Sequence, residues 1–233
     1  MTIDASTQPE RVLSSDDRTA SALRGFGPLG IIAILAILAG NFLIVPLSAI
    51  LVLVWVRWSR TPWREIGYVR PASWVSTITI GIVFGAAFKL LMKIVVMPLL
   101  GADPVNHAYH FLAGNRDALP GMIVTLIVVA GFGEETVFRG YLFERFGKLF
   151  GSSAWAKAIT VLITASWFGA AHYSVQGLAG AEQAAIVGLV YGTIFAITGR
   201  IWMLMVAHAA FDLVALAIIY WDVESQVAHL IFK

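Results

Sequence analysis

The sequence lacks cysteine and carries little charge. Asp, Glu, Lys and Arg make up 13% of its 233 residues, whereas soluble domains carry roughly 25%. The absence of cysteine excludes disulfide bonds, thiolate metal ligands and cysteine nucleophiles. The small charged fraction, beside a hydrophobic fraction of 59%, excludes an ordinary soluble domain. The net charge of +2 is not gathered in a basic patch, so nothing favours a nucleic-acid partner.

Two common hydrolase signatures are missing as well. The H-E-x-x-H element of the soluble zinc proteases does not occur, and neither does the G-x-S-x-G element that presents a serine nucleophile. Internal repeats, low-complexity tracts and signs of a second domain are also absent from the sequence. The chain therefore predicts one membrane domain over residues 28–233, preceded by a polar tail over residues 1–27 that is floppy or lies on the surface.

Long apolar blocks make up most of the chain. A membrane-spanning helix needs about 20 apolar residues, and the blocks predict an all-α polytopic bundle of about six spans. The first block is expected to be one helix kinked at Pro46, with a short hairpin as the alternative. Small residues in the fifth block allow close helix packing. The predicted spans are residues 28–56, 74–100, 121–150, 155–171, 181–198 and 201–220.

The loop over residues 57–71 joins the first two blocks and is rich in arginine and aromatic residues. Short loops with many basic residues favour the cytoplasmic side of a membrane, and aromatic rings favour the headgroup region. The loop is therefore expected at the cytoplasmic interface, with Trp58, Trp63 and Tyr68 at headgroup depth.

Four polar residues in or near the loop after the second predicted span are not expected to have a functional role. Lys89 and Lys93 share a helix face, where they could line a polar cavity. We expect instead that both side chains extend to the surface, because long basic side chains do so near helix ends. His107 and His110 lie in the following loop and could bind a metal, but they are expected to be ordinary loop residues.

The most informative residues are two adjacent carboxylates after an apolar run. Arg139 follows Glu135 by four residues. An ionised carboxylate in hydrocarbon is costly unless it is paired or lies in a water-filled cavity. On a helix Arg139 can pair with Glu135, while Glu134 points about 100° away. Glu134 is then free to hold a water, a metal or a proton; alternatively, all three charges reach the headgroups at a helix end.

Further ionisable residues lie in the later spans. His172 directly follows the fourth predicted span, Glu182 lies near the start of the fifth, and His208 and Asp212 lie one turn apart in the sixth. Such groups should converge on the bundle interior, because lipid-facing positions are costly. Each one alone could make a structural hydrogen bond, and Asp212 could pair with Arg200. Three motifs on three helices together indicate a catalytic or ion site.

Two chemistries suit this set. Glu134, His172 and His208 form a ligand set for a divalent metal such as zinc, with a position left for water. Without thiolates the same set suits manganese or cobalt. In a metal-free alternative Glu134 activates a water directly.

The order and spacing of these motifs resemble a known family. The motifs are E-E-x-x-x-R from Glu134, F-x-x-x-H ending at His172 and H-x-x-x-D from His208. They are similar to the three motifs of the CPBP family, over about residues 121–216. This family includes CAAX prenyl proteases of the Rce1 type and bacteriocin-processing or self-immunity enzymes, also called Abi proteins. The resemblance implies an intramembrane metalloendopeptidase.

Roles for individual residues follow from the resemblance. Glu134 would activate the attacking water. His172 and His208 would bind the metal, zinc being the expected one, or stabilise the oxyanion. Glu135 and Arg139 would form a structural or secondary pair. The expected partners are a membrane protein or lipidated peptide as substrate and the lipid bilayer.

Asp212 departs from the pattern of the prenyl-protease branch, which has asparagine there. An asparagine can donate a hydrogen bond to a developing oxyanion, whereas an ionised aspartate cannot. This weakens the specific expectation of CAAX cleavage and leaves that of hydrolysis intact. The alternative function is a non-hydrolytic membrane protein for immunity, scaffolding or proton or ion transport, which would use the same polar cluster.

Overall fold

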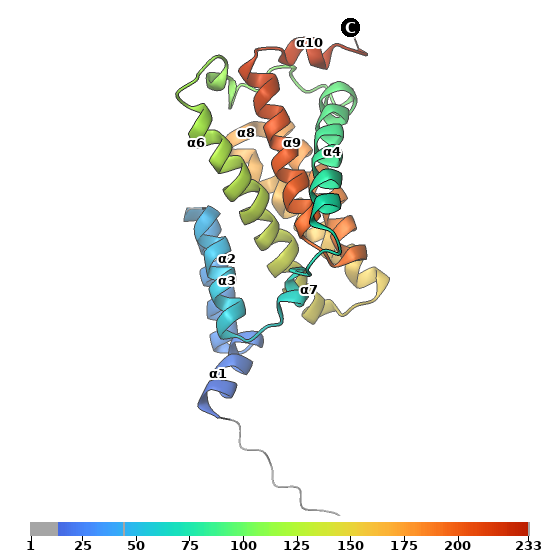
Figure 1. The fold of residues 1–233 in the computed structure, drawn as a ribbon. Coiled ribbons are helices and arrows are strands. Elements are labelled where there is room, and N and C mark those ends of the chain that lie inside the picture. The colour runs from blue at the N-terminus through green and yellow to red at the C-terminus, as the bar shows by residue number, and fades with distance from the viewer. Residues whose placement is uncertain (1–13, 44, 233) are drawn as a thin grey trace, which may run out of the picture.

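The computed structural model describes residues 14–43 and 45–232, and the regular elements in this part of the chain are helices (Figure 1). Here η1 and η3 are 3₁₀ helices, and η2, η4 and η5 are π-helical. In chain order the elements are α1 (Ser15–Arg24), α2 (Pro28–Leu43), α3 (Val45–Trp58), η1 (Trp63–Ile66), α4 (Trp74–Leu91), η2 (Met92–Val96), α5 (Met97–Leu99), η3 (His110–Leu112), α6 (Leu119–Val124), η4 (Thr125–Glu134), η5 (Thr136–Tyr141), α7 (Leu142–Phe150), α8 (Ala154–Thr198), α9 (Trp202–Tyr220) and α10 (Glu224–Ala228).

Several helical stretches are long and apolar enough to cross a membrane. Four pass this test among the described residues: Trp74–Leu99, Leu119–Phe150, Ala154–Thr198 and Trp202–Tyr220. A fifth is added if α1 and α2, which meet at a bend of 56°, form one broken span. The chain is an integral multi-pass membrane protein. The predicted all-α bundle is confirmed, and the expected number of about six spans is approximate.

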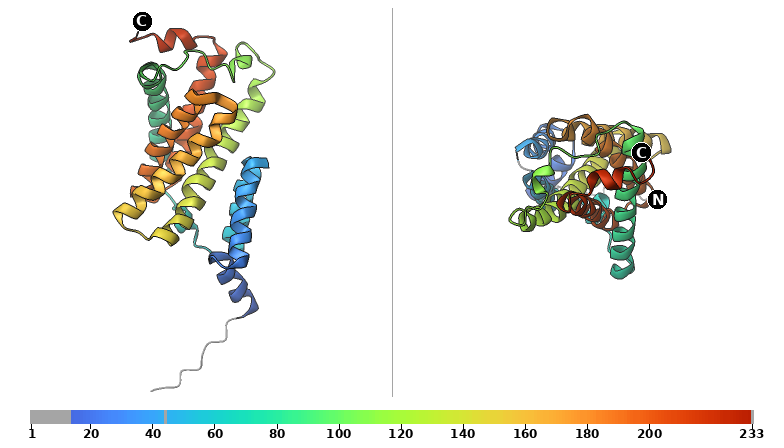
Figure 2. Two further views of the ribbon diagram at one scale, coloured as in Figure 1. Left: turned by 180° about the vertical axis from the view of Figure 1, so that it is seen from behind. Right: turned by 90° about the horizontal axis from the view of Figure 1, so that it is seen from above.

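The first apolar block folds as a hairpin. α2 and α3 lie side by side (Figures 1 and 2), and the Ser48 hydroxyl donates to the Ile37 carbonyl at 2.7 Å. Pro46 is the second residue of α3, where a backbone N–H would have no partner within the helix. The proline therefore begins a helix and does not bend one. The expectation of a single helix kinked at Pro46 was wrong, and the hairpin alternative is the one observed.

Part of the polar tail is helical. The Ser14 side chain caps α1 by accepting a backbone N–H of its first turn. At the other end of α1 the Trp55 indole N–H of α3 donates to the Leu23 carbonyl at 3.0 Å. α1 is thus fastened to α3 and mostly exposed, which agrees with a surface-lying segment and not with a floppy one. Residues 1–13 of that tail lie outside the described residues.

Basic residues gather at the end of the bundle where α1 lies. Arg24 pairs with Glu65 at 3.3 Å, and Arg60 pairs with Asp17, so α1 lies beside the arginine-rich loop over residues 57–71. The hairpin brings the N-terminal arginines to this end, because the chain crosses and returns before the loop begins. The positive-inside rule predicts that this end faces the cytoplasm.

α8 consists of two antiparallel limbs, seen behind α9 in Figure 1 and in front in the left view of Figure 2. Gly177 joins them with φ 66° and ψ −163°, a conformation that glycine adopts readily. An added Cβ at Gly188 would lie 2.8 Å from Ala165 Cα, and one at Gly169 would lie 2.9 Å from Ala185 Cβ. This reversal separates the predicted fourth and fifth spans, and the predicted close packing of their small residues is confirmed.

α9 packs between α4 and the helix that carries the two glutamates (Figure 1). Glycines permit this close approach. An added Cβ at Gly85 of α4 would lie 2.0 Å from the Ala207 carbonyl oxygen, and one at Gly131 of η4 would lie 3.0 Å from Ala209 Cβ. Close contacts with α4 on one side and with η4 on the other therefore fix the position of α9, and with it the position of its polar residues.

A substitution at Gly85 tests this packing. We expect Gly85→Ala to lower the free energy of unfolding by about 1–3 kcal/mol, because the new methyl group must push backbone away from backbone. Gly147→Ala is the matched control, since Gly147 is also helical and has no atom within 4 Å of an added Cβ. It should leave stability unchanged or raise it by up to about 1 kcal/mol. Unfolding in mixed detergent micelles measures both, and equal effects would contradict the packing.

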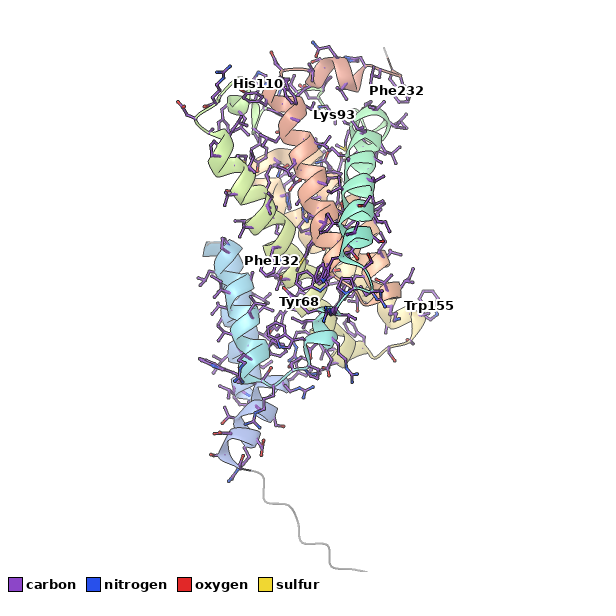
Figure 3. The ribbon with its side chains drawn as sticks, in the orientation of Figure 1. Tyr68, Lys93, His110, Phe132, Trp155 and Phe232 are labelled. Carbon is purple, nitrogen blue, oxygen red and sulfur yellow. The ribbon has the colours of Figure 1, made fainter. Side chains whose placement is uncertain are left out.

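A buried carboxylate organises the opposite end of the bundle. Glu224 of α10 pairs with Lys93 Nζ at 3.5 Å and His110 Nδ1 at 3.3 Å, and it accepts the Asn106 backbone N–H at 2.9 Å. Figure 3 shows Lys93 and His110 at this end, near α10. The expectation that Lys93 extends to the surface was wrong, because its side chain is 12% exposed and ends at this buried acid.

Candidate active site

The two adjacent glutamates lie where two π-helical segments meet. η4 ends at Glu134, and η5 begins at Thr136. A π turn closes i→i+5 hydrogen bonds and shifts the faces of the residues that follow, and such turns occur often at functional sites. The predicted side-chain pair forms all the same, because Arg139 Nη1 donates to Glu135 Oε1 at 2.9 Å.

Glu135 is the centre of a buried polar cluster. The side chains of Glu135 and Arg139 are 0% and 2% exposed. Glu135 Oε1 also accepts the Nδ1–H of His208 at 2.7 Å, which joins the glutamate helix to α9. The Arg139 guanidinium lies over the rings of Phe168 and Tyr191, 4.9 and 5.6 Å from their centroids. The ion pair, the hydrogen bond and these cation–π contacts offset the cost of burying the charges.

The second imidazole nitrogen of His208 faces two more carboxylates. Its Nε2 lies 3.8 Å from Glu134 Oε2 and 3.6 Å from Asp212 Oδ2. Both distances exceed that of a direct hydrogen bond. Glu134 Oε2 is buried, and the described residues offer it no hydrogen-bond partner. Asp212 therefore lies beside His208, and the expected alternative of a pair between Asp212 and Arg200 is not observed in the described residues.

His172 is held by its own helix. Its Nδ1–H donates to the Phe168 carbonyl at 2.8 Å, so Nε2 is the nitrogen left for other partners. The Phe168 ring packs edge-on against both histidines, 4.6 Å from the His172 ring and 6.0 Å from the His208 ring. This aromatic contact holds the first limb of α8 against α9 at the level of the two imidazoles.

One cavity collects the side chains that face away from the buried cluster. It has a volume of about 230 Å³, and its wall includes Glu134, His172, His208 and Asp212. The remaining wall is mostly apolar and comes from α4, η3 and the loop before it, α6, η4, α8 and α9. Glu182 does not line this cavity. The structure thus brings together four of the residues selected from the sequence and places the pair of Glu135 and Arg139 behind them.

Lys89 also lines this cavity, which corrects the sequence prediction. Its side chain is buried and does not extend to the surface, since the residue is only 6% exposed. Lys89 Nζ donates to Gln183 Oε1 at 3.0 Å and lies 4.9 Å from the centroid of the Phe211 ring. The close contact of α4 with α9 leaves this face of α4 inside the bundle, so the side chain has no path to the headgroups.

Tyr68 contacts the helix that carries the two glutamates, a role that was not predicted from the sequence. Its hydroxyl donates to Thr136 Oγ1 at 2.8 Å, and Thr136 donates in turn to the Phe132 carbonyl at 2.7 Å. Figure 3 shows Tyr68 and Phe132 near each other, and their rings pack edge-on. Burial raises the pKa of Tyr68 to about 12. The loop therefore holds the helix in place directly after the two glutamates, through the hydrogen bond and ring contact of the half-buried Tyr68.

A comparison with protein families found a match to the part of the chain that contains the motifs. The family model for Rce1-like type II CAAX prenyl endopeptidases matches residues 116–214, a range that contains all three motifs. Residues 116–214 are therefore similar to the Rce1-like family. No curated protein and no solved structure matches the chain.

The Rce1-like segment supplies Glu134, His172, His208 and Asp212, whereas Lys89 and Tyr68 come from outside it. The family is one of membrane CAAX endopeptidases, so its members cleave peptide bonds. Part of the cavity wall and the contact that holds the glutamate helix in place are therefore built by residues that the family match does not cover.

The Rce1-like site has donors suited to a divalent ion, although they are not gathered at one point. Two imidazole nitrogens and the carboxylate of Glu134 are ligands that zinc accepts, and Glu134 Oε2 is a buried oxygen in need of a partner. Within residues 14–43 and 45–232, however, no group of three or more His, Cys, Asp or Glu side chains is arranged to hold a metal ion. A bound metal therefore stays a prediction from the resemblance.

Proposed function

We propose that the chain is an intramembrane endopeptidase that hydrolyses a peptide bond of a membrane-associated protein or lipidated peptide. The observation that carries this proposal is Glu134 Oε2, a buried oxygen without a partner among the described residues, on a carboxylate that lines a cavity with two histidines. A buried, unsatisfied carboxylate oxygen is unfavourable unless a ligand or water completes it. The Rce1-like match supplies the reaction class.

Glu134 acts as the general base in this proposal. Its carboxylate takes a proton from a water, and the water oxygen forms a bond to the carbonyl carbon of the substrate. Glu134 then gives that proton to the leaving amine nitrogen as the C–N bond breaks. The products are a new carboxylate and a new amino terminus. The largely apolar wall of the cavity lowers the local dielectric, which strengthens the electrostatic interactions inside it.

The two histidines stabilise the oxyanion that forms on the carbonyl oxygen. Each imidazole uses Nδ1 as a donor within the protein, to Phe168 in one case and to Glu135 in the other. Nε2 is then the atom that a protonated imidazole can direct at the oxyanion. Asp212 lies beside His208 Nε2 and, when ionised, can accept a hydrogen bond but cannot donate one. Asp212 therefore orients the His208 imidazole or favours its protonated form.

A panel of lipidated and transmembrane peptides tests the proposal. Purified full-length protein in detergent would be incubated with each peptide, and products would be separated by chromatography. We expect at least one peptide to be cleaved by the wild type and not by Glu134→Gln. The absence of cleavage by both, together with a Glu134-dependent proton or ion flux into liposomes, would overturn the protease and support a transporter.

The metal predicted from the resemblance is the alternative to this use of the two histidines, and it needs a separate measurement. Glu134, His172 and His208 would hold it, and it would supply a Lewis acid for the carbonyl oxygen. We expect elemental analysis after gentle purification to find close to one zinc or other divalent ion per chain. His172→Ala and His208→Ala should each lose it, because an open zinc site has only three protein ligands. Full activity after exhaustive chelation would contradict this prediction.

A further inference from the structure

A second, larger cavity adjoins the catalytic one. Its volume is about 460 Å³. The two cavities share part of their walls, including Lys89, Gln176 and Gln183. The larger one extends toward the end of the bundle where Lys93 approaches Glu224. A substrate that reaches Glu134 therefore has room on one side for a few further residues, with Lys89 at the junction.

Lys89 is a buried cation whose hydrogen-bonding capacity is largely unused. An ammonium group has three N–H donors, and the described residues give Lys89 Nζ one acceptor, Gln183 Oε1 at 3.0 Å. Its other polar contact is the face of the Phe211 ring. Placing a charge in the membrane interior is costly, so such residues usually mark the place of a charged ligand or a transport path.

The neighbouring cations have carboxylate partners. Arg139 pairs with Glu135 at 2.9 Å, and Lys93 pairs with Glu224 at 3.5 Å and donates to the Pro104 carbonyl. Among the residues that the structure describes, Lys89 has no carboxylate within ion-pair distance. It is therefore the cation at these cavities that is available to an anionic group entering from outside the protein.

We propose that Lys89, assisted by Gln176 and Gln183, binds the free C-terminal carboxylate of the peptide substrate. This inference rests on the proposed endopeptidase function. A carboxylate accepts several hydrogen bonds, and an ammonium beside two carboxamides can donate them. A chain end suits this space better than a continuing chain, because Glu224 holds the loop and α10 together at its far end. An acidic side chain near the substrate's C terminus offers the same chemistry, so the two sources need separate tests.

The test uses cleaved peptides from the panel, each prepared as a free acid and as a C-terminal amide. We expect wild type to cleave the acid with a kcat/KM about 30-fold higher, since losing one partner of a buried charge pair has an effect of this size or more. Lys89→Met should bring the ratio to near one, and Lys89→Arg should retain most of it. Lys157→Met is the control, since Lys157 of α8 lines neither cavity, and it should keep the wild-type ratio.

Three results would overturn the inference. One is a wild-type enzyme that cleaves acid and amide equally. Another is an equal loss on both peptides in Lys89→Met, which would make Lys89 only a counter-charge for Asp212. A third arm compares amidated peptides ending in aspartate or asparagine. A preference for aspartate that Lys89→Met removes would assign the site to an acidic side chain and not to the chain end.

A binding measurement separates this inference from the proposed function. Glu134→Gln, with and without Lys89→Met, would be titrated with a fluorescent free-acid peptide and its amide. We expect the acid to bind about 30-fold more tightly than the amide to Glu134→Gln, and equally in the double variant. If wild type cleaves no peptide, the endopeptidase proposal fails, while the titration still decides whether Lys89 binds a carboxylate. Equal binding of acid and amide by Glu134→Gln would overturn the inference itself.

Discussion

Glu134→Gln should lower kcat/KM for peptide cleavage by about 10³-fold, because an amide cannot take the proton of the attacking water. The fold should survive, since Glu134 Oε2 makes no hydrogen bond to the described residues that an amide would break. We expect the free energy of unfolding to stay within about 1 kcal/mol of wild type. Initial rates with a cleaved peptide, beside unfolding in mixed micelles, measure the two effects separately.

Glu182→Gln is the matched control for this variant. Glu182 is a glutamate near the start of the second limb of α8, and it lines neither cavity. We expect it to keep wild-type activity. A rate in Glu134→Gln within tenfold of wild type would mean that another group activates the water, and the assignment of Glu134 as the base would be wrong.

Arg139→Met should have the largest effect on stability. The substitution leaves Glu135 buried at 0% exposure without its arginine and removes the cation from the rings of Phe168 and Tyr191. Breaking a buried ion pair by removing one partner costs about 3–5 kcal/mol. We expect a loss of this size in the free energy of unfolding, with loss of activity wherever the protein remains folded, because Glu135 also orients His208.

Lys148→Met is the control, since Lys148 forms the same i,i+4 pair with Glu144 on the same long helix. The Lys148 side chain is 31% exposed, and Glu144 keeps Arg145 as a second partner. We expect a change of about 0–1 kcal/mol. Similar losses in Arg139→Met and Lys148→Met would show that burial of the inner pair contributes little.

The residues of the candidate site could be selected from the sequence because they are ionisable groups in apolar spans. Glu134, His172, His208 and Asp212 are conspicuous there, and the cost of charge in hydrocarbon predicts that they face inward. Because the same cost applies to Glu135 and Arg139, their spacing of four residues on a helix predicted that they form a pair. Spacing along helices therefore carried most of the information about which side chains meet.

Tertiary packing decided what the sequence left open. Lys89 looks like any lysine near a helix end, and only the contact of Gly85 with Ala207 shows that its face of α4 is buried. In the sequence Tyr68 resembles an interfacial aromatic residue, and only the structure shows the hydrogen bond of its hydroxyl to Thr136. Glu134 and His172 lie on different helices, and only the packing of the bundle shows that both line one cavity.

Local backbone geometry was equally invisible in the sequence. The π-helical segments around Glu134 contain no proline, and their glycines are common in membrane helices. The reversal at Pro46 depends on whether a proline begins a helix or interrupts one, and both are compatible with the same apolar block. The arrangement of the first helices was therefore predicted less well than that of the last ones.

Cleavage in water enriched in the heavy oxygen isotope tests hydrolysis at this site most directly. A peptide cleaved in the panel would be incubated with purified full-length protein in lipid nanodiscs, and both fragments would be identified by mass spectrometry. We predict a single cut, with one solvent oxygen in the new carboxylate of the N-terminal fragment, and no fragments with Glu134→Gln. Fragments without the isotope, or labelled fragments that form equally with Glu134→Gln, would contradict a water activated by Glu134.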